Sequence, residues 1–415
     1  MYDLISQAKS AKSASYKLMN ISAEKKSAAL CEIANALIKH TDEILYENQK
    51  DIILLKQNPA KASFADRLKL TKERILQMAE GVRQVDLLPD PVGEVTGMTK
   101  RPNGLVIGKK RVPLGVIGII YEARPNVTVD AAALCIKTSN ACILRGGSEA
   151  INSNKILARV MNDALKSVGF PEGSVSLVED TSREIANEMM RLNEYIDVLI
   201  PRGGKGLIQA VVTNATVPVI ETGTGNCHIY IEKSADLNMA TEILVNAKTS
   251  RPSVCNAAES LLVDESIADK VLPIISEKLK PYNVEIRGCD KTLKILPESV
   301  KATQEDYYTE YNDFILSVKV VDGIDEAIEH INRHGTKHSE AIVTENYNMS
   351  QKFLDEVDAA AVYVNASTRF TDGFEFGFGA EIGISTQKLH ARGPLGLAEL
   401  TTLKYIIYGN GQVRG

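Results

Sequence analysis

Residues 116–144 read VIGIIYEARPNVTVDAAALCIKTSNACIL, and this stretch decides the fold. Its two ends, 116–120 and 142–144, are short runs of apolar and β-branched residues that are typical of buried strands. Between them, residues 127–138 have the length and pattern of a helix. A strand, a helix and a second strand in this order form a crossover unit, whose two strands pair in parallel. The stretch therefore predicts an α/β fold built on a parallel sheet.

The same rhythm continues along the chain. A helix is expected over 150–168, with further strands over 175–178 and 198–200. The pattern restarts at Cys227 and continues to about residue 364, which predicts a second α/β unit.

The two ends of the chain depart from this rhythm. Residues 1–88 are predicted to be helical, and Pro89-Asp90-Pro91 ends this layer. Residues 97–114 are interpreted as a short pair of strands with turn residues, which predicts a hairpin that stands off the main body. The last apolar run, KYIIYG at 404–409, predicts a closing strand.

Composition excludes several classes of function. The chain has 415 residues, 44% of them hydrophobic, and a formal net charge of -5. The longest basic run is Lys109-Lys110-Arg111, which disfavours binding to nucleic acid or to an acidic membrane surface. No apolar stretch approaches the ~18 residues of a membrane span, and the N-terminus lacks the apolar core of a signal peptide. Six cysteines without C-x-x-C spacing favour reduced thiols and a cytoplasmic location.

Three chemical groups are expected at separate strand ends. Cys255 lies in RPSVCNAAE, after a predicted helix and before an apolar run; Glu221 opens the Gly-rich ETGTGNC; Asn126 follows the strand at 116–120. A thiol that attacks, an amide that stabilises an oxyanion and a carboxylate that moves protons or orders the site predict chemistry at an acyl carbon. Cys255 is also expected to open a helix, whose dipole would lower the thiol pKa.

Plainer interpretations stay open for each group. A free cysteine is more often a small buried apolar residue than a nucleophile, and Cys31, Cys135, Cys142 and Cys289 are interpreted as packing. Cys227 flanks the Gly-rich segment and is left undecided. Asn126 could cap the next helix, and Glu221 could be a solvated strand end.

Two strand ends carry a cation, glycines and a helix start. They are Arg145-Gly146-Gly147-Ser148 and Arg202-Gly203-Gly204-Lys205. Backbone amides and the helix dipole favour an anion at such turns, and two cationic sites suit a dinucleotide with an extra phosphate, NADPH rather than NADH. The alternative is that both are ordinary strand-to-helix turns, since no G-x-G-x-x-G follows the first strand.

A metal site is not predicted. His330, His334 and His338 are close in sequence, but Gly335 interrupts the helix between them and no carboxylate or cysteine completes a ligand set.

The quoted segments resemble the aldehyde dehydrogenase superfamily. VPLGVIGIIYEARPN at 112–126 is similar to the strand that leads to that family's oxyanion asparagine, which implies this role for Asn126. ETGTG is similar to its Glu-Leu-Gly-Gly element, and Cys255 matches its catalytic cysteine. The resemblance further implies that Arg145 stands where the family has its adenosine-ribose lysine, a departure that fits a 2′-phosphate. Glu310 in TEYNDFIL resembles the glutamate that holds the nicotinamide ribose.

Residues 321–342 and 376–397 narrow the resemblance to members that act on L-glutamyl 5-phosphate. It implies NADPH-dependent reduction to L-glutamate 5-semialdehyde, the second step of proline biosynthesis, through a Cys255 thioester. The resemblance gives less support to Glu221 as a general base, because ETGTGNC departs from the family's Glu-Leu-Gly-Gly-Lys. The predicted substrate contacts are Arg251, Arg369, Glu122 and Arg124, with Arg392 close to the motifs.

The resemblance also implies the domain organisation. We expect an aldehyde dehydrogenase-like fold of two doubly wound parallel-sheet domains, an NADPH-binding domain over 1–98 and 113–222 and a catalytic domain over 223–364. Residues 99–112 and 380–415 would form an oligomerisation hairpin and C-terminal strand, so a homo-oligomer is expected. A transient contact with glutamate 5-kinase is left open.

Two rival functions remain. One is a non-phosphorylating NAD(P)-dependent aldehyde dehydrogenase, which hydrolyses its thioester. The other is a catalytically silent dinucleotide-binding or assembly protein that keeps the fold. Dependence on phosphate and selective labelling of Cys255 separate these from the reductase.

Overall fold

The computed structural model describes residues 3–57 and 64–414, and the chain divides into two compact units. The first contains the chain up to Thr222 together with residues 377–383 and 395–415. The second contains residues 223–376 and 384–394. Within the described ranges, no helix is both long and apolar enough to cross a membrane.

A four-stranded parallel sheet lies at the centre of the first unit, in the order β5-β4-β3-β6. Every residue of β3 is buried, because helices cover the sheet. This confirms the crossover unit predicted from residues 116–144. The strands are β3 (Val116–Tyr121), β4 (Ala141–Arg145), β5 (Val175–Leu177) and β6 (Val198–Arg202), and the helices between and after them are α6 (Pro125–Lys137), η2 (Ser148–Ala150), α7 (Ile151–Ser167), α8 (Arg183–Met189) and α9 (Lys205–Asn214).

The predicted helical layer precedes this sheet. Three of its helices begin where the side chains of Asp3, Ser22 and Thr71 accept hydrogen bonds from free backbone amides. The buried Asp51 accepts from the backbone N–H of Ser153 at 2.8 Å, which ties this layer to the start of α7. The helices are α1 (Leu4–Leu18), α2 (Ala23–Lys39), α3 (Thr41–Lys56), α4 (Ala65–Leu68) and α5 (Lys72–Leu87).

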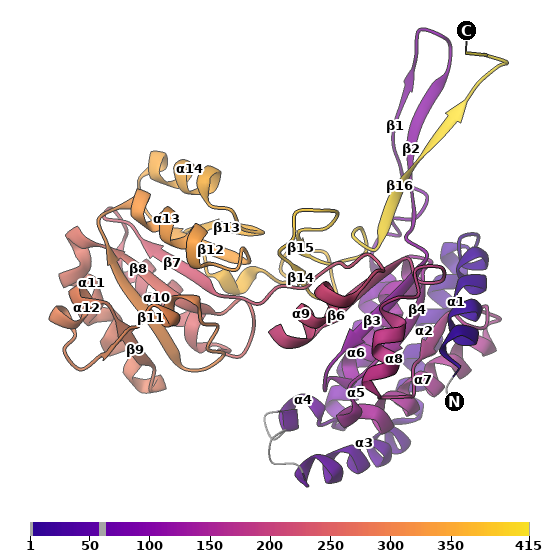
Figure 1. Ribbon diagram of the computed structural model, residues 1–415, viewed down its shortest axis with the longest axis horizontal. Helices are drawn as coiled ribbons and strands as arrows, with labels where there is room; N and C mark the ends of the chain where they lie inside the picture. Colours follow the sequence, from indigo (N-terminus) through magenta and orange to yellow (C-terminus); the bar gives the residue numbers. More distant parts are fainter. Residues whose placement is uncertain (1–2, 58–63, 415) are drawn as a thin grey trace. The chain divides into compact units, whose positions relative to one another are not determined.

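An antiparallel three-stranded sheet extends from the first unit (Figure 1). Its strands are β1 (Val95–Lys100), β2 (Val106–Pro113) and β16 (Thr401–Tyr408), in the order β1-β2-β16. Strand β16 pairs with β2 along its whole length, from Thr401 opposite Pro113 to Tyr408 opposite Val106. The predicted hairpin and the predicted closing strand therefore belong to one sheet.

A seven-stranded parallel sheet forms the second unit, in the order β10-β9-β11-β8-β7-β12-β13 (Figure 1). Alternate residues of β7 serve two cores: Ile229 and Ile231 pack with α10 and α11, whereas Tyr230 packs with α13 and α14. A sheet covered on both faces confirms the doubly wound α/β fold.

The remaining bounds complete this unit. Its strands are β7 (Cys227–Ile231), β8 (Ala258–Asp264), β9 (Glu285–Gly288), β10 (Val300–Lys301), β11 (Ile315–Val321), β12 (Ser339–Val343), β13 (Ala361–Val364), β14 (Ile384–Ser385) and β15 (Gly393–Pro394). Its helices are α10 (Leu237–Thr249), α11 (Glu265–Leu279), η3 (Lys280–Tyr282), α12 (Asp290–Ile295), η4 (Glu305–Tyr308), α13 (Ile324–His334), α14 (Tyr347–Glu356) and η5 (Thr368–Phe370).

Candidate active site

Three predicted residues follow the carboxyl ends of adjacent strands in the first unit. Strands β4, β3 and β6 are neighbours, and they lead directly into the loops at Gly146, Glu122 and Gly203. Loops at the carboxyl edge of a parallel sheet are the usual place for ligands in such folds.

Glu122 organises the loop that precedes α9. Its Oε2 accepts a hydrogen bond from the backbone N–H of Gly204 at 2.8 Å. A Cβ at Gly203 would lie 2.6 Å from the same oxygen, so a side chain at this position would displace the Glu122 carboxylate. The carboxylate of Glu122, a predicted substrate contact, is thus bound to the loop that Arg202 and Lys205 flank.

Arg145 lies at the end of β4 and is partly buried. Its Nη2 donates to the carbonyl oxygens of Thr181 at 2.6 Å and Ser182 at 3.1 Å, which precede α8. Burial lowers the pKa of Arg145, and its buried Nε has no hydrogen-bond partner among the described residues. A guanidinium with donor capacity to spare fits the predicted anion site beside Gly146, Gly147 and Ser148.

Asn126 and Glu221 also lie in the first unit. Asn126 is the second residue of α6, and its Nδ2 donates to Asp130 Oδ2 at 2.9 Å, one turn further on. Arg124 holds the cap position of α6, so the alternative interpretation of Asn126 as the helix cap is wrong. Before Glu221, the expected strand at 217–220 is reduced to a single bridge between Val219 and Leu199.

Cys255 lies in the second unit, half-buried, in turns between α10 and β8. It does not open a helix, and this corrects the expectation of a helix dipole acting on the thiol. The side chain of Asn256 explains the turn: its Nδ2 donates to the carbonyl oxygens of Arg369 at 3.2 Å and Thr371 at 2.9 Å. These bonds hold the segment in an irregular conformation that leads into β8.

Three further hydrogen bonds fix the backbone around the thiol. Cys227 Sγ donates to the carbonyl oxygen of Cys255 at 3.1 Å, and Thr368 Oγ1 donates to that of Asn256 at 2.8 Å. The N–H of Ala257 donates to Val254 at 3.0 Å. The segment is therefore held in place on each side of the cysteine.

The Gly-rich segment packs directly on this turn. A Cβ at Gly225 would lie 1.4 Å from the carbonyl oxygen of Cys255, so only glycine fits. The N–H of Gly225 donates to Glu310 Oε1 at 2.7 Å. The second unit thus brings together Cys255, the segment beginning at Gly223 and Glu310.

Two arginines lie near Cys255. Arg369 Nε donates to Ser250 Oγ at 3.1 Å, and its guanidinium also contacts Asn256 Oδ1. Burial and the positive charge of Arg251 lower the pKa of Arg369. Neither arginine forms an ion pair with another described residue, whereas Arg392 is paired with Asp358 at 2.7 Å. Arg251 and Arg369 are thus available to an anionic ligand.

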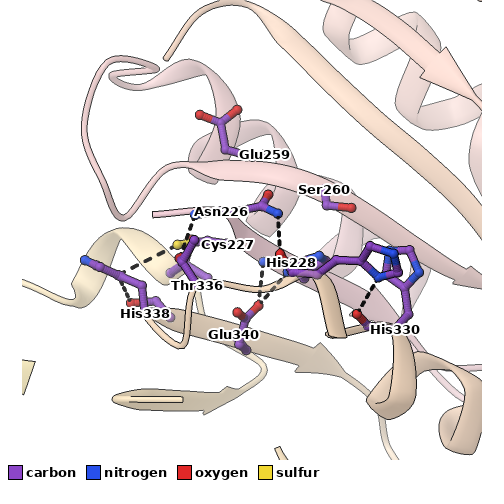
Figure 2. Close-up of polar contacts among 12 residues, drawn as sticks. Asn226, Cys227, His228, Glu259, Ser260, His330, Thr336, His338 and Glu340 are labelled. Carbon is purple, nitrogen blue, oxygen red and sulfur yellow. Dashed lines mark hydrogen bonds and ion pairs between the residues drawn. The ribbon is translucent and has the colours of Figure 1, made fainter. Parts of the chain in front are cut away.

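The histidines are arranged for packing. The rings of His330 and His334 stack with centroids 4.1 Å apart, and burial lowers the pKa of His330 to about 2. His338 instead lies between Cys227 Sγ at 3.8 Å and Ser339 Oγ at 2.8 Å (Figure 2). Within 3–57 and 64–414, no group of three side chains is placed to hold a metal ion.

Sequence reasoning missed a buried ion pair behind the site. Lys248 Nζ lies 2.6 Å from Glu259 Oε2, and both side chains are inaccessible to solvent. Burial raises the pKa of Glu259 to about 7, against the opposing effect of Lys248. Glu259 Oε1 also accepts from the N–H of Asn312 at 3.0 Å, which anchors the loop that carries Glu310. The only indication of this ion pair in the sequence was a lysine and a carboxylate that lie close to Cys255 along the chain.

Comparison with known proteins shows the family to which the chain belongs. The model of the aldehyde dehydrogenase family matches residues 2–297. A gamma-glutamyl phosphate reductase from Clostridium perfringens is 65% identical over 412 residues, 99% of each chain. The crystal structure of gamma-glutamyl phosphate reductase from Thermotoga maritima superposes with a TM-score of 0.97 at 52% identity, over 100% of both chains. An acetylating aldehyde dehydrogenase from Geobacillus thermoglucosidasius shares the fold, with a TM-score of 0.72 at 18% identity over 100% of this chain and 98% of that one.

Proposed function

Since the chain belongs to the aldehyde dehydrogenase family, and within it to the gamma-glutamyl phosphate reductases, we propose that it reduces L-glutamyl 5-phosphate to L-glutamate 5-semialdehyde with NADPH. This reaction is the second step of proline biosynthesis. One observation carries the proposal: a half-buried thiol, Cys255, lies on a turn into which Gly225 packs so tightly that no side chain fits. Such a fixed nucleophile suits attack on an activated acyl carbon.

The proposed mechanism is covalent. The Cys255 thiolate attacks the acyl carbon, phosphate leaves, and a thioester remains on the sulfur. Bound NADPH supplies the hydride that reduces this thioester. The carbon–sulfur bond then breaks, which releases the aldehyde and regenerates the Cys255 thiolate. The backbone N–H of Cys255 and the side-chain amide of Asn126 are the proposed donors to the oxyanion, and Glu221 is proposed to orient the site or assist proton transfer.

The cofactor is proposed to bind through the first unit. The supporting feature is the pair of loops at Arg145 to Ser148 and Arg202 to Lys205, which follow β4 and β6 on either side of β3 and precede helices. Arg145 supplies the charge proposed to select a 2′-phosphate, and so NADPH over NADH. Glu310 is the proposed partner of the nicotinamide ribose.

The substrate is proposed to bind through its negative charges. Arg251 and Arg369 repel each other and form no ion pair with a described carboxylate, so an anion between them would relieve this repulsion. Glu122 and Arg124 remain proposed contacts of the substrate's amino-acid end.

The cellular setting follows from the same proposal. None of the six cysteines, all of which lie in the described ranges, forms a disulfide, which suits the reducing cytoplasm. The sheet of β1, β2 and β16 is proposed to pair with a second copy of the chain. A transient contact with glutamate 5-kinase would shorten the lifetime of the free acyl phosphate.

Phosphate dependence tests the function. With L-glutamate 5-semialdehyde and NADP as substrates, formation of NADPH should require phosphate or arsenate as the acyl acceptor. A hydrolytic aldehyde dehydrogenase would turn over equally well without either anion. Turnover without an acceptor would therefore contradict the proposed reductase and support a hydrolytic aldehyde dehydrogenase.

A further inference from the structure

Cys227 is a second thiol beside the nucleophile, and the mechanism above does not use it. It is the first residue of β7 and is completely buried. Its Sγ lies 3.1 Å from the carbonyl oxygen of Cys255. Burial raises the pKa of Cys227 well above its ordinary value, so the thiol keeps its proton and can donate it to this oxygen.

An irregularity in the sheet lies at this residue. Cys227 pairs with Ala258, but the next residue, His228, pairs with Ser260, so Glu259 is an extra residue in β8. A bulge of this kind bends the strand and turns a side chain in a new direction, and bulges are frequent beside active sites. Here the bulge begins three residues after Cys255, where the turn enters β8.

The segment that carries Cys227 is itself held firmly (Figure 2). The N–H of Asn226 donates to Thr336 Oγ1 at 2.9 Å. Its Nδ2 donates to the carbonyl oxygens of Tyr307 at 2.8 Å and His334 at 3.0 Å. With Asn226 fixed by three bonds, the Cys227 thiol has little freedom to move away from Cys255.

The far side of the thiol is also ordered. His338 Nδ1 lies 3.8 Å from Cys227 Sγ and 2.8 Å from Ser339 Oγ, which in turn contacts Thr371 Oγ1 at 2.6 Å. The carbonyl oxygen of Thr371 accepts from Asn256. A chain of polar contacts thus runs from Cys227 around to the residue that follows the nucleophile.

We propose that Cys227 is a positioning residue for Cys255. Its S–H holds the Cys255 carbonyl oxygen, which fixes the peptide plane that follows the nucleophile and with it the direction of the nucleophilic side chain. The effect of this positioning on turnover rests on the proposed function, whereas the hydrogen bond itself does not depend on it. Small errors in the alignment of a nucleophile are costly, on the order of 100-fold for about 1 Å.

Serine and alanine substitutions separate this role from simple packing. Cys227→Ser keeps a donor of similar size, whereas Cys227→Ala removes it. Cys142→Ala is the matched control, since it deletes another fully buried thiol from a parallel strand, in the first unit. If Cys227→Ala does not fold, Cys227→Val, which fills the space without a donor, takes its place.

Two measurements are made on the full-length variants. We expect Cys227→Ala to lower kcat by about 10- to 100-fold with the KM values nearly unchanged, and Cys227→Ser to stay within about 3-fold of the unsubstituted protein. Hydrogen–deuterium exchange, which needs no substrate, should become faster in the peptide containing Cys255 for Cys227→Ala only.

The outcomes are distinct. Unchanged exchange around Cys255 in Cys227→Ala, or a serine variant as impaired as the alanine variant, would overturn the positioning role. Exchange around Cys255 could become faster in Cys227→Ala although the unsubstituted protein does not turn over L-glutamyl 5-phosphate. That result would support the role of Cys227 and contradict the proposed function.

Discussion

The proposed chemistry depends on Cys255, because its thiol is the proposed nucleophile. Replacing it with alanine removes the nucleophile while leaving the first unit, with its proposed cofactor loops, intact. We expect Cys255→Ala to lower turnover by at least about 1,000-fold. The affinity for NADPH, measured by nicotinamide fluorescence, should change by less than about 2-fold, and the absence of tryptophan keeps the background low.

Labelling provides the control for this prediction. Cys255 is half-buried, whereas Cys135, Cys142 and Cys227 are fully buried. A thiol reagent should therefore label Cys255 faster than these three. A variant without Cys255 that still turns over would exclude the covalent mechanism.

The structure leaves room only for glycine at position 225. Alanine there would place its Cβ 1.4 Å from the Cys255 carbonyl oxygen, so the Gly-rich segment or the nucleophile must shift. We expect Gly225→Ala to lower kcat by on the order of 100-fold, because the shift misaligns the thiol.

Gly81→Ala is the matched control for this change. Gly81 lies inside α5, and nothing lies within 4 Å of an added Cβ. This substitution should leave kcat unchanged and raise the free energy of unfolding by roughly 0.4–1 kcal/mol. Equal kcat values for the two variants would contradict the packing argument.

At this scale, the sequence supported proposals for single residues but did not predict their surroundings. The proposed nucleophile and its Gly-rich neighbour could be proposed from the sequence because their spacing and composition are local. The helix expected at Cys255 was wrong, because Asn256 is held by Arg369 and Thr371, more than 110 positions further along the chain. Sequence patterns do not show such distant partners.

At the scale of the elements, the loop between β10 and β11 carries Glu310, and Asp306 holds this loop in place. This carboxylate accepts from Arg287 Nη1 at 2.7 Å, from the N–H of Thr303 at 2.7 Å and from the Tyr311 hydroxyl at 2.8 Å. Burial raises the pKa of Asp306, but these hydrogen bonds outweigh it and hold the pKa well below its ordinary value of 3.8.

The sign of the pH effect follows from this lowered pKa. A carboxylate with a lower pKa in the folded state stabilises the fold above its unfolded pKa, and this contribution is lost as the pH falls. We expect the free energy of unfolding to decline below about pH 4, and Asp306→Asn to flatten that decline while lowering stability at pH 7. Denaturant unfolding between pH 2 and 7 measures both; parallel curves for the two proteins would contradict the role of Asp306.

The ion pair between α10 and β8 gives a second prediction for elements. Lys248→Met leaves Glu259 buried without its cation and should cost about 3–5 kcal/mol of stability. Adding Glu259→Gln removes the uncompensated charge and keeps an acceptor for Asn312, so the double variant should recover part of the loss. A double variant as unstable as the sum of the single ones would show that the pair is not coupled.

Most strands and helices could be predicted because apolar runs of strand length alternate with helical segments. The expected strand before Glu221 failed, since Pro218 interrupts it and only Val219 pairs with β6. The buried strand β3 was recognisable because nearly every residue in it is apolar, and β8 was recognisable from the apolar run at 261–263 within it. Short edge strands such as β10, with both residues exposed, carry no such signal.

For the whole molecule, the chain path near the C-terminus was the least predictable feature. Residues 377–383 belong to the first unit, 384–394 to the second, and 395–415 to the first again. Residues 380–415 had been expected to lie together with the C-terminal strand. Backbone pairing explains the difference: Ile384 pairs with Pro394 as β14 and β15, and Gly223 donates to Ile384 at 2.8 Å. These pairings join parts of the chain that are distant in sequence.

The β1-β2-β16 sheet supports the last prediction, which concerns assembly. Leu403, Tyr405 and Ile407 alternate along β16, so they share one face, and they are 43%, 65% and 59% exposed. Apolar side chains gathered on an exposed sheet, beside unpaired strand edges, are typical of an interface with another chain. We expect the double substitution Tyr405→Lys and Ile407→Lys to convert an oligomer to a monomer, as measured by light scattering. Tyr347→Lys, which places the same charge at a 73% exposed position of α14, should leave the mass unchanged. If the unsubstituted protein is already monomeric, or the double variant keeps its mass, this sheet is not the interface.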